Sequence, residues 1–566
     1  MSHVFNLRTG REPCPRRRLV VILSVAMALA LGLSLPALRP ETAGAAPRPN
    51  FVIIQTDDQP IEQFHGRWRD GMDRRRLIMP NAMRLLRDQG IEFSRYMTPY
   101  PICAPSRASL LSGNYAHNHG VLRVGGSNGG WAAFRSNTIL RENLAVWLQR
   151  AGYRTLHFGK FMNFYGGMDE PVETRVPPGW DRWVSDATDN STRQYYGYSQ
   201  NIDGRAAGPF GSILYTPWDQ KDPVSCPSLG LGRCDYHSDA MSLKAVRSIE
   251  NSGRRPFFLQ VDYHAPHGDQ TRPIGPEPAV RHYRSALRTG ARKMPGFNEP
   301  DVSDKPAAMR AIAPMDRKEI RQIRDEHQRS IESLRSVDDG VRWIYEALEA
   351  AGKLDNTYII FTSDNGFFLG QHRVSRGKLL PYEPALRVPM VIRGPGIEPG
   401  STSREVVANQ DIAPTLLNLA GARAARRMDG RSMVRFWKKP GRISRRPILI
   451  SSYSSATKDP QGDYPGESLV PSGGPGSGEQ GAGTSGLVPK TDYVGIRLGP
   501  YKYVELESGE GELYVLTRDP AELENRYSDR RYRRVVRFLA DELDRLRGCR
   551  AAECREPTGR WPQPPG

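Results

Sequence analysis

The sequence predicts an α/β fold with a large mixed, mostly parallel sheet sandwiched by helices, and with a small antiparallel sheet and a helix near the C-terminus. Unbroken apolar segments recur along most of the chain, and such segments are typical of parallel strands buried on both faces. Helical patterns lie between these segments. After residue 490 apolar and polar residues alternate, which indicates antiparallel strands with one exposed face.

The expected elements follow one another along the chain. Buried strands are expected at residues 50–57, 153–158, 256–263, 357–363 and 389–393. Helices are expected at residues 79–90, 103–112, 139–151, 242–251 and 317–351. The C-terminal strands are expected at residues 493–497, 501–506 and 512–516, and the last helix carries Val535, Leu539, Leu543 and Leu546 on one face.

Two segments lack these patterns. Residues 165–240 are rich in Gly, Trp, Tyr and Asp, and we expect them to be irregular insertions that face the substrate. Residues 456–490 are dense in Gly, Ser and Pro, which predicts a flexible loop that adds little to the core. This loop separates a main domain, residues 46–455, from a C-terminal subdomain, residues 491–566.

The N-terminus has the pattern of an export signal. Several arginines precede an apolar run at residues 19–35, and Ala43-Gly44-Ala45 offers a small-residue cleavage site, so residues 1–45 are expected to be a secretory signal peptide. Arg16-Arg17-Arg18-Leu19-Val20 loosely resembles a twin-arginine signal, which leaves both the Sec and the twin-arginine export routes open. A membrane anchor is the alternative, but no second long apolar segment follows. We expect a secreted or extracytoplasmic protein without membrane contact after signal removal.

The composition is ordinary for a soluble protein, but the charge is not. Hydrophobic residues make up 38% and charged residues 25% of the 566 residues, and the formal net charge is +18. This excess fits either a solvated surface or attraction to polyanions. The arginines of the C-terminal helix are interpreted as a solvated face, so no nucleic-acid partner is expected.

Oxygen-bearing side chains follow two of the expected buried strands. Asp57-Asp58 ends the first strand, and Asp364-Asn365 ends another. Open α/β sheets place their sites at the carboxyl ends of strands, and adjacent acids repel each other unless a cation joins them. Four hard oxygen ligands without Cys or His fit Ca²⁺ or Mg²⁺, and flexible carboxylate and amide ligands favour Ca²⁺. A solvated turn is the alternative for the Asp-Asp pair.

A short motif begins at Cys103. Pro105 lies near its start and Gly113 closes it, which predicts a short helix with Cys103 at its N-terminus, where backbone N–H groups favour an anion. The pattern Cys103-x-Pro-x-Arg107, followed by Ala-Ser-Leu-Leu-Ser-Gly, resembles the sulfatase family, in which this cysteine is oxidised to formylglycine. A buried structural cysteine is the alternative interpretation.

Further motifs extend this resemblance over about residues 48–545, in the order that the family has them. They are Gly159-Lys160, His264-Ala265-Pro266-His267 and Gly377-Lys378. The resemblance implies an alkaline-phosphatase-like fold and five catalytic residues, namely Cys103, Arg107, Lys160, His267 and Lys378. It also implies a metal site made by Asp57, Asp58, Asp364, Asn365 and the modified Cys103. The Gly-Lys-x-x-Asn pattern that ends at Asn163 resembles the N-acetylglucosamine-6-sulfatase branch, whereas many sulfatases have histidine where this chain has Met162.

The resemblance implies hydrolysis of sulfate monoesters by a formylglycine diol and a divalent cation. The expected substrate is a sulfated small molecule or glycan with a 6-sulfated N-acetylglucosamine-like sugar, and the expected partner is a formylglycine-generating enzyme. An arylsulfatase and a phosphonate or phosphate monoester hydrolase of the same superfamily are the alternatives. An inactive secreted glycan-binding protein is a hypothesis of a different class, and the intact site residues argue against it.

The remaining cysteines form two sequence-close pairs. Cys14 leaves with the signal and Cys103 is assigned above, which leaves Cys226 with Cys234 and Cys549 with Cys554. An even number in an exported chain predicts two small disulfide loops. Zinc binding is the rival interpretation, but neither pair has a His or Cys quartet with zinc spacing.

Overall fold

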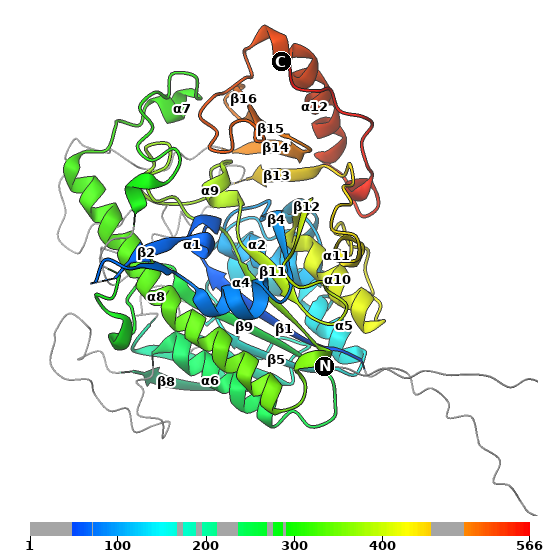
Figure 1. Cartoon of the computed structure of the whole chain (residues 1–566). Helices are drawn as coiled ribbons and strands as arrows, with labels where there is room; N and C mark the ends of the chain where they lie inside the picture. The colour runs from blue at the N-terminus through cyan, green and yellow to red at the C-terminus, as the bar shows by residue number, and fades with distance from the viewer. Residues whose placement is uncertain are drawn as a thin grey trace, which may run out of the picture. The chain divides into compact units, whose positions relative to one another are not determined.

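A ten-stranded mixed sheet forms the centre of the fold (Figure 1), in the order β12-β4-β11-β10-β1-β9-β5-β6-β7-β8. Along the chain these strands are β1 (Asn50–Asp57), β4 (Ile91–Met97), β5 (Arg154–Gly159), β6 (Arg182–Asp186), β7 (Tyr198–Ile202), β8 (Arg205–Phe210), β9 (Phe257–Pro266), β10 (Thr357–Ser363), β11 (Met390–Arg393) and β12 (Ser401–Ala408). The five central strands from β10 to β6 are all parallel to one another. Strand β11 is antiparallel to both β10 and β4, and β12 is parallel to β4. The expected mixed, mostly parallel sheet is therefore confirmed.

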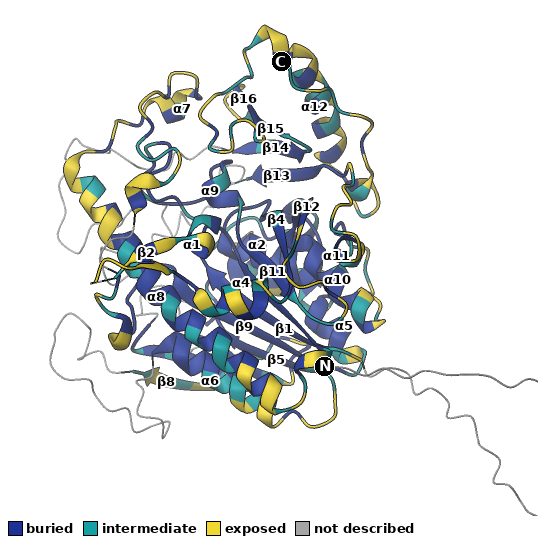
Figure 2. Ribbon diagram, viewed as in Figure 1, coloured by how far each residue is buried: buried dark blue, intermediate teal, exposed yellow. Residues whose placement is uncertain are grey.

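Helices cover both faces of this sheet. Phe51 and Ile53 of β1 pack into an apolar cluster with α2 (Cys103–Ser112), α4 (Gly130–Ser136), α5 (Leu144–Arg150), α10 (Ile412–Ala420) and α11 (Val434–Lys438). The alternate residues, Val52 and Ile54, pack into a second cluster with α6 (His237–Glu250) and α8 (Arg317–Ala350). Because successive side chains of a strand point to opposite faces, both faces of β1 are buried, as Figure 2 shows. This explains why the strand is apolar without alternation.

The C-terminal part of the chain forms a four-stranded antiparallel sheet with one long helix. Its order is β13-β14-β15-β16, from β13 (Ile448–Ser452), β14 (Tyr493–Leu498), β15 (Tyr501–Leu506) and β16 (Gly511–Val515). Helix α12 (Arg533–Leu546) buries the expected side chains Val535, Leu539, Leu543 and Leu546 against this sheet. The first strand of this sheet thus lies within residues 46–455, the expected main domain, and the other three lie within residues 491–566, the expected C-terminal subdomain. A disulfide joins Cys549 to Cys554, as expected.

The region at residues 165–240 differs from the expectation of irregular structure. Its described parts contain three strands, β6, β7 and β8, which extend the main sheet. These strands are short and carry polar residues at buried positions. Gln200 donates to Asp186 at 2.9 Å, and Asn201 donates to the Tyr165 hydroxyl at 2.7 Å. Hydrogen-bonded amides replace apolar side chains there, so the sequence lacks the apolar run that predicts a buried strand.

The computed structural model describes residues 48–70, 72–166, 174–187, 195–211, 236–268, 275–286, 290–453 and 492–565. The chain divides into a unit of residues 1–47 and a unit of residues 48–566. The expected signal peptide, the expected loop at residues 456–490 and the pair Cys226 and Cys234 lie outside the described residues. Among the residues that are described, none of the helices has the length and apolar character needed to cross a membrane.

Candidate active site

The carboxyl ends of β1 and β10 bring a group of oxygen-bearing side chains together. The two strands are parallel neighbours that pair in register to their last residues. The side chains at these two strand ends are Asp57, Asp58, Asp364 and Asn365, and all four are buried. Asn365 Nδ2 donates to Asp58 Oδ1 at 2.6 Å, and the Asp58 backbone N–H donates to Asp364 Oδ1 at 3.3 Å. Carboxylate oxygens of the three aspartates lie within 4.8 Å of one another.

This arrangement fits a divalent cation. Burial raises the pKa of Asp58, and it raises the pKa of Asp364 to about 7, with Asp57 adding to both shifts. Burial would also raise the pKa of Asp57, but nearby cations, Lys160 foremost, hold it well below its usual range. Asn365 Oδ1 is buried without a hydrogen-bond partner in the described structure. Closely packed oxygen donors with excess negative charge are the ligands that Ca²⁺ and Mg²⁺ prefer.

Helix α2 begins at Cys103 and points its N-terminus at this group. Pro105 is tolerated in the first turn because the N–H that it lacks would have no partner within the helix. Gly113 ends the helix in the left-handed conformation, with φ 71°, which glycine adopts without strain. The sequence therefore determines both ends of the helix that presents residue 103.

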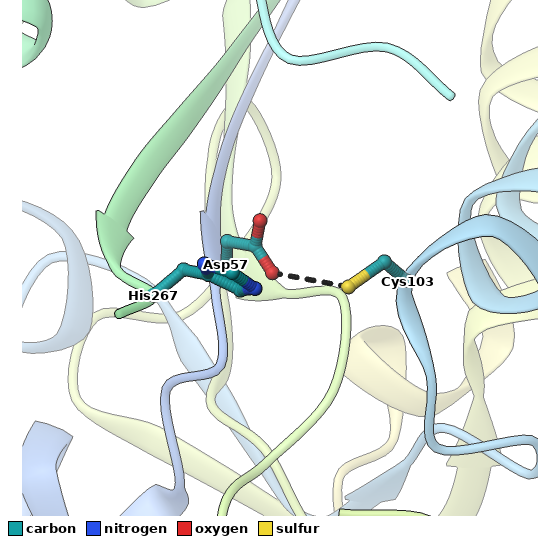
Figure 3. A group of neighbouring side chains, drawn as sticks. All are labelled: Asp57, Cys103 and His267. Atoms are coloured by element: carbon teal, nitrogen blue, oxygen red, sulfur yellow. Dashed lines mark hydrogen bonds between the residues drawn. The ribbon is translucent and has the colours of Figure 1, made fainter. Parts of the chain in front are cut away.

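The thiol of Cys103 is fully buried between the carboxylate of Asp57 and the ammonium group of Lys378. Its Sγ lies 3.3 Å from Asp57 Oδ1, and Figure 3 shows the two side chains pointing toward each other. Lys378 Nζ donates to the same sulfur at 2.9 Å. Burial, and then Asp57, raise the pKa of this thiol well above its ordinary value. An unmodified Cys103 is therefore protonated at neutral pH and is a poor nucleophile.

Two lysines reach the carboxylates from separate elements. Lys160 follows β5, and its Nζ donates to Asp57 Oδ2 at 2.5 Å. Lys378 belongs to the loop after β10, and its Nζ donates to Asp58 Oδ1 at 2.7 Å as well as to Cys103. Both lysines are buried. They supply positive charge in a site from which most water is excluded, where that charge acts strongly.

Arg107 lies one turn into α2 and joins three parts of the site. Its Nε donates to Asp364 Oδ2 at 2.8 Å, and its Nη1 donates to the Lys160 backbone oxygen at 2.9 Å. The same Nη1 lies 3.5 Å from Asp262 Oδ1. The sequence interpretation gave Asp262 no role, although it is the only acidic residue of β9. Asp262 in turn lies 3.0 Å from His157 Nε2, so it connects Arg107 to the sheet.

His267 directly follows β9 and faces the carboxylates. Its Nδ1 lies 2.8 Å from the Gly268 backbone oxygen, which can only accept a hydrogen bond, so Nδ1 carries a proton. The other ring nitrogen, Nε2, lies 3.8 Å from Asp58 Oδ2. One ligand atom each of Asp57, Cys103 and His267 lies within 4.8 Å of the other two (Figure 3). His267 Nε2 is therefore directed into the site.

A second buried cluster lies behind His267, and sequence reasoning missed it. Asp186 Oδ2 lies 2.9 Å from both His237 Nε2 and His264 Nε2. Asp186 Oδ1 also accepts a hydrogen bond from Gln200 at 2.9 Å. Burial lowers the pKa of His264 to about 4, so this ring is neutral at pH 7. Through His264, which lies three residues before His267, the cluster fixes the end of β9. Its members come from separate elements, so no sequence motif links them.

The match to known proteins covers the same part of the chain as this site. The sulfatase family model matches residues 49–422. The extracellular sulfatase SULF-1 homolog of Drosophila melanogaster is 32% identical over 433 residues, which are 75% of this chain and 33% of that protein. The N-acetylglucosamine-6-sulfatase of Homo sapiens is 30% identical over 420 residues, which are 73% of this chain and 68% of that protein. The chain thus spans only a third of the fruit-fly relative's length.

A solved structure agrees with the fold. It holds a protein in complex with its substrate D-glucosamine-2-N,6-O-disulfate, and it is 22% identical to this chain with a TM-score of 0.64. The similarity covers 88% of this chain and 97% of that chain. The family model extends over more than half of the sequence and includes every residue of the site described above, and on this basis the chain belongs to the sulfatase family.

Proposed function

We propose that this protein hydrolyses sulfate monoesters of carbohydrates, with 6-sulfated N-acetylglucosamine-like sugars as the substrate class. The observation that carries the proposal is the position of Cys103 at the first residue of α2, in contact with both Asp57 and Lys378. The Gly-Lys-x-x-Asn pattern at Asn163 and the similarity to relatives named N-acetylglucosamine-6-sulfatase support the sugar specificity.

Two groups complete the proposed site. A formylglycine made from Cys103 by a formylglycine-generating enzyme would, once hydrated, supply a hydroxyl nucleophile and a second hydroxyl that allows sulfate to leave. A divalent cation, Ca²⁺ rather than Mg²⁺, would be held by Asp57, Asp58, Asp364, Asn365 and the modified residue 103, and it would supply positive charge for the peripheral oxygens of the sulfuryl group.

The side chains have separate tasks in this proposal. Lys160 and Lys378 bind the peripheral oxygens of the sulfate ester, which gain negative charge as the ester bond breaks. Arg107 orients residue 103 through the contacts that it makes with Asp364 and the Lys160 backbone. His267 in its doubly protonated form, with Nδ1–H held by the Gly268 backbone oxygen, donates the Nε2 proton to the leaving alkoxide, because an alkoxide is a poor leaving group unless it is protonated.

The proposed place of action is outside the cytoplasm. The arginine-rich, apolar N-terminus supports an export signal, and the disulfide between Cys549 and Cys554 is typical of oxidising compartments. The proposed partners are the sulfated sugar and the enzyme that modifies Cys103. Neither nucleic acid nor membrane contact after signal removal is part of the proposal.

A comparison of rates tests this function. Protein from its own exporting host is assayed for kcat/KM on N-acetylglucosamine 6-sulfate, an aryl sulfate, the matched aryl phosphate and a phosphonate monoester. We expect the sugar sulfate and the aryl sulfate to be hydrolysed faster than the phosphorus esters. A preference for a phosphorus ester would support a phosphonate or phosphate hydrolase instead. Binding of sulfated sugars without turnover would support the inactive glycan-binding protein.

A further inference from the structure

A cavity lies where the main sheet meets the C-terminal sheet. It has a volume of about 150 Å³, and residues of β4, β12, β14 and the segment after β16 line it. Four of the lining side chains are arginines, namely Arg95, Arg387, Arg404 and Arg497, and one is a carboxylate, Glu383. None of the residues proposed above for catalysis or metal binding lines this cavity.

The arginines are held in place although they repel one another. Arg497 is only 5% exposed, and its Nη1 donates to the backbone oxygens of Gly499 and Tyr501 at 2.6 and 3.0 Å. Arg387 Nε donates to the Ser94 backbone oxygen at 3.1 Å. These two guanidinium groups are thus fixed by backbone acceptors that are neutral and do not cancel their charge.

The other two arginines lack even these partners. Within the described ranges, the side chains of Arg95, which is half-buried, and Arg404, which is exposed, make no hydrogen bond and no ion pair. Burial lowers the pKa of Arg95, and the charges of Arg404 and Arg387 lower it further. Burial also lowers the pKa of Arg497 to about 10, although Glu383 acts in the opposite direction. The cavity is therefore an environment in which a negative charge would be stabilised.

The single carboxylate does not balance this charge. Glu383, the first residue of α9 (Glu383–Leu386), lies 3.7 Å from the buried Lys502 Nζ on the other side. Lys502 also pairs with Glu522, and the charge of Glu383 acts on Arg387 and Arg497 as well as on Lys502. Arg95, Arg387, Arg404 and Arg497 together carry four positive charges around one small space.

We propose that this cavity binds a free tetrahedral oxyanion, such as inorganic sulfate or phosphate. Planar guanidinium groups donate paired hydrogen bonds to such anions, and the bonds are strengthened by charge. The volume is below the range of roughly 300–1,000 Å³ that is usual for drug-sized ligands, so it suits a small ion rather than a sugar chain. Because β4 and β12 belong to one sheet and β14 to the other, the bound ion stabilises the junction between them.

Crystals soaked in selenate test the location directly. Selenate is tetrahedral and carries a strong anomalous scatterer. We expect an anomalous peak within hydrogen-bond distance of Arg95 and Arg497, separate from any peak at Cys103. Anomalous peaks only at the catalytic centre or at the molecular surface would overturn the proposal. This outcome does not depend on whether the protein hydrolyses sulfate esters.

Melting temperatures test the chemistry in solution. Sodium sulfate and sodium chloride are compared at matched ionic strength on the wild type, on R95Q/R404Q and on the control R534Q/R537Q, which removes two exposed arginines of α12. We expect sulfate to stabilise the wild type and the control, because a ligand that binds only the folded state raises its stability. Calorimetric titration should give about tenfold weaker sulfate binding to the cavity in R95Q/R404Q.

Chloride alone gives a second readout. Without an oxyanion, R95Q/R404Q should be at least as stable as the wild type, because like-charge repulsion is removed.

Equal stabilisation of R95Q/R404Q and the wild type by sulfate would refute the proposal. N-acetylglucosamine 6-sulfate, added as a second ligand in the Cys103→Ala background that does not turn it over, should stabilise the proteins with and without R95Q/R404Q equally. A difference with this sugar and none with sulfate would overturn the assignment to a free ion. If R95Q/R404Q does not fold, the selenate map of the wild type decides.

Discussion

Lys378 Nζ lies 2.9 Å from Cys103 Sγ and 2.7 Å from Asp58 Oδ1, so one ammonium group contacts both the N-terminus of α2 and the carboxylates at the end of β1. Lys378 and Cys103 are 275 positions apart in the sequence. A protonated thiol gains little from this contact, whereas an oxyanion or a hydroxyl in its place would gain a strong charge-assisted hydrogen bond. The geometry thus favours a modified residue 103.

The first prediction concerns residue 103 itself. Cys103→Ser and Cys103→Ala should abolish turnover, because neither side chain can become the aldehyde whose diol releases sulfate. The measurement is kcat on a sulfate ester, combined with the mass of the tryptic fragment that carries residue 103 in the wild type. Melting temperatures near that of the wild type would exclude misfolding as the cause. Turnover near the wild-type rate by either variant would rule out the proposed nucleophile.

The second prediction separates proton donation by His267 from a structural role. His267→Gln should lower kcat on a sugar sulfate by about 10²- to 10⁴-fold, because the alkoxide then leaves without a proton. With an aryl sulfate, whose phenolate leaves readily, the loss should be much smaller. His117→Gln is the control, since His117 lies against the backbone oxygen of Cys549, away from the carboxylates. Equal losses on both substrates would contradict a role of His267 as proton donor.

The proximity of Asp57 and Asp364 could be predicted from the sequence, whereas that of Arg107 and Asp262 could not. Each of the first two follows an unbroken apolar strand, and parallel strands align their carboxyl ends. Asp262 lies within a strand as a single acid, and only the folded structure brings it 3.5 Å from Arg107. A motif specifies which residues are near one another in sequence, but contacts between distant elements depend on helix and strand packing.

The same limit applies to the strands at residues 182–210. Their buried positions hold Gln200 and Asn201, which are stabilised by hydrogen bonds to Asp186 and Tyr165 rather than by apolar burial. Periodicity detects apolar burial only, so it predicts the centre of the sheet and fails at this edge. The arginine cavity was missed for a related reason, because Arg95, Arg404 and Arg497 belong to three strands of two sheets.

The third prediction concerns the cation. A chelator should lower the melting temperature, because the buried carboxylates of Asp57, Asp58 and Asp364 then repel one another without a joining charge. Calcium should restore the melting temperature more fully than magnesium. Asp58→Asn should weaken calcium binding by at least about tenfold. Metal content by mass spectrometry and the melting temperature are the readouts, with Asp541→Asn on the exposed face of α12 as control. An unchanged calcium content in Asp58→Asn would remove Asp58 from the ligand set.

The last prediction links stability to pH through Asp338, which is not one of the residues of the proposed site. Asp338 on α8 accepts hydrogen bonds from the backbone N–H groups of Asn81 and Ala82, at 3.0 and 2.8 Å, and so satisfies the start of the helix at Ala82–Arg87. These hydrogen bonds lower the pKa of Asp338, but burial raises it more, and the result is a pKa of about 6. The folded protein therefore holds a proton that the unfolded chain has released above its ordinary pKa of 3.8.

The sign of the pH effect follows from this difference in proton binding. The stability that protonated Asp338 contributes is fully present below about pH 4 and is lost as the pH rises through about 6, by roughly 2–3 kcal/mol in total. The side chain introduced by Asp338→Asn cannot titrate, so the variant does not lose this stability. The melting temperature of Asp338→Asn should therefore rise relative to that of the wild type between pH 4 and pH 7. Asp325→Asn, at an exposed position of the same helix, should show no such shift. A constant difference between Asp338→Asn and the wild type across this range would mean that Asp338 is already ionised in the fold, and that the donors at Asn81 and Ala82 outweigh its burial.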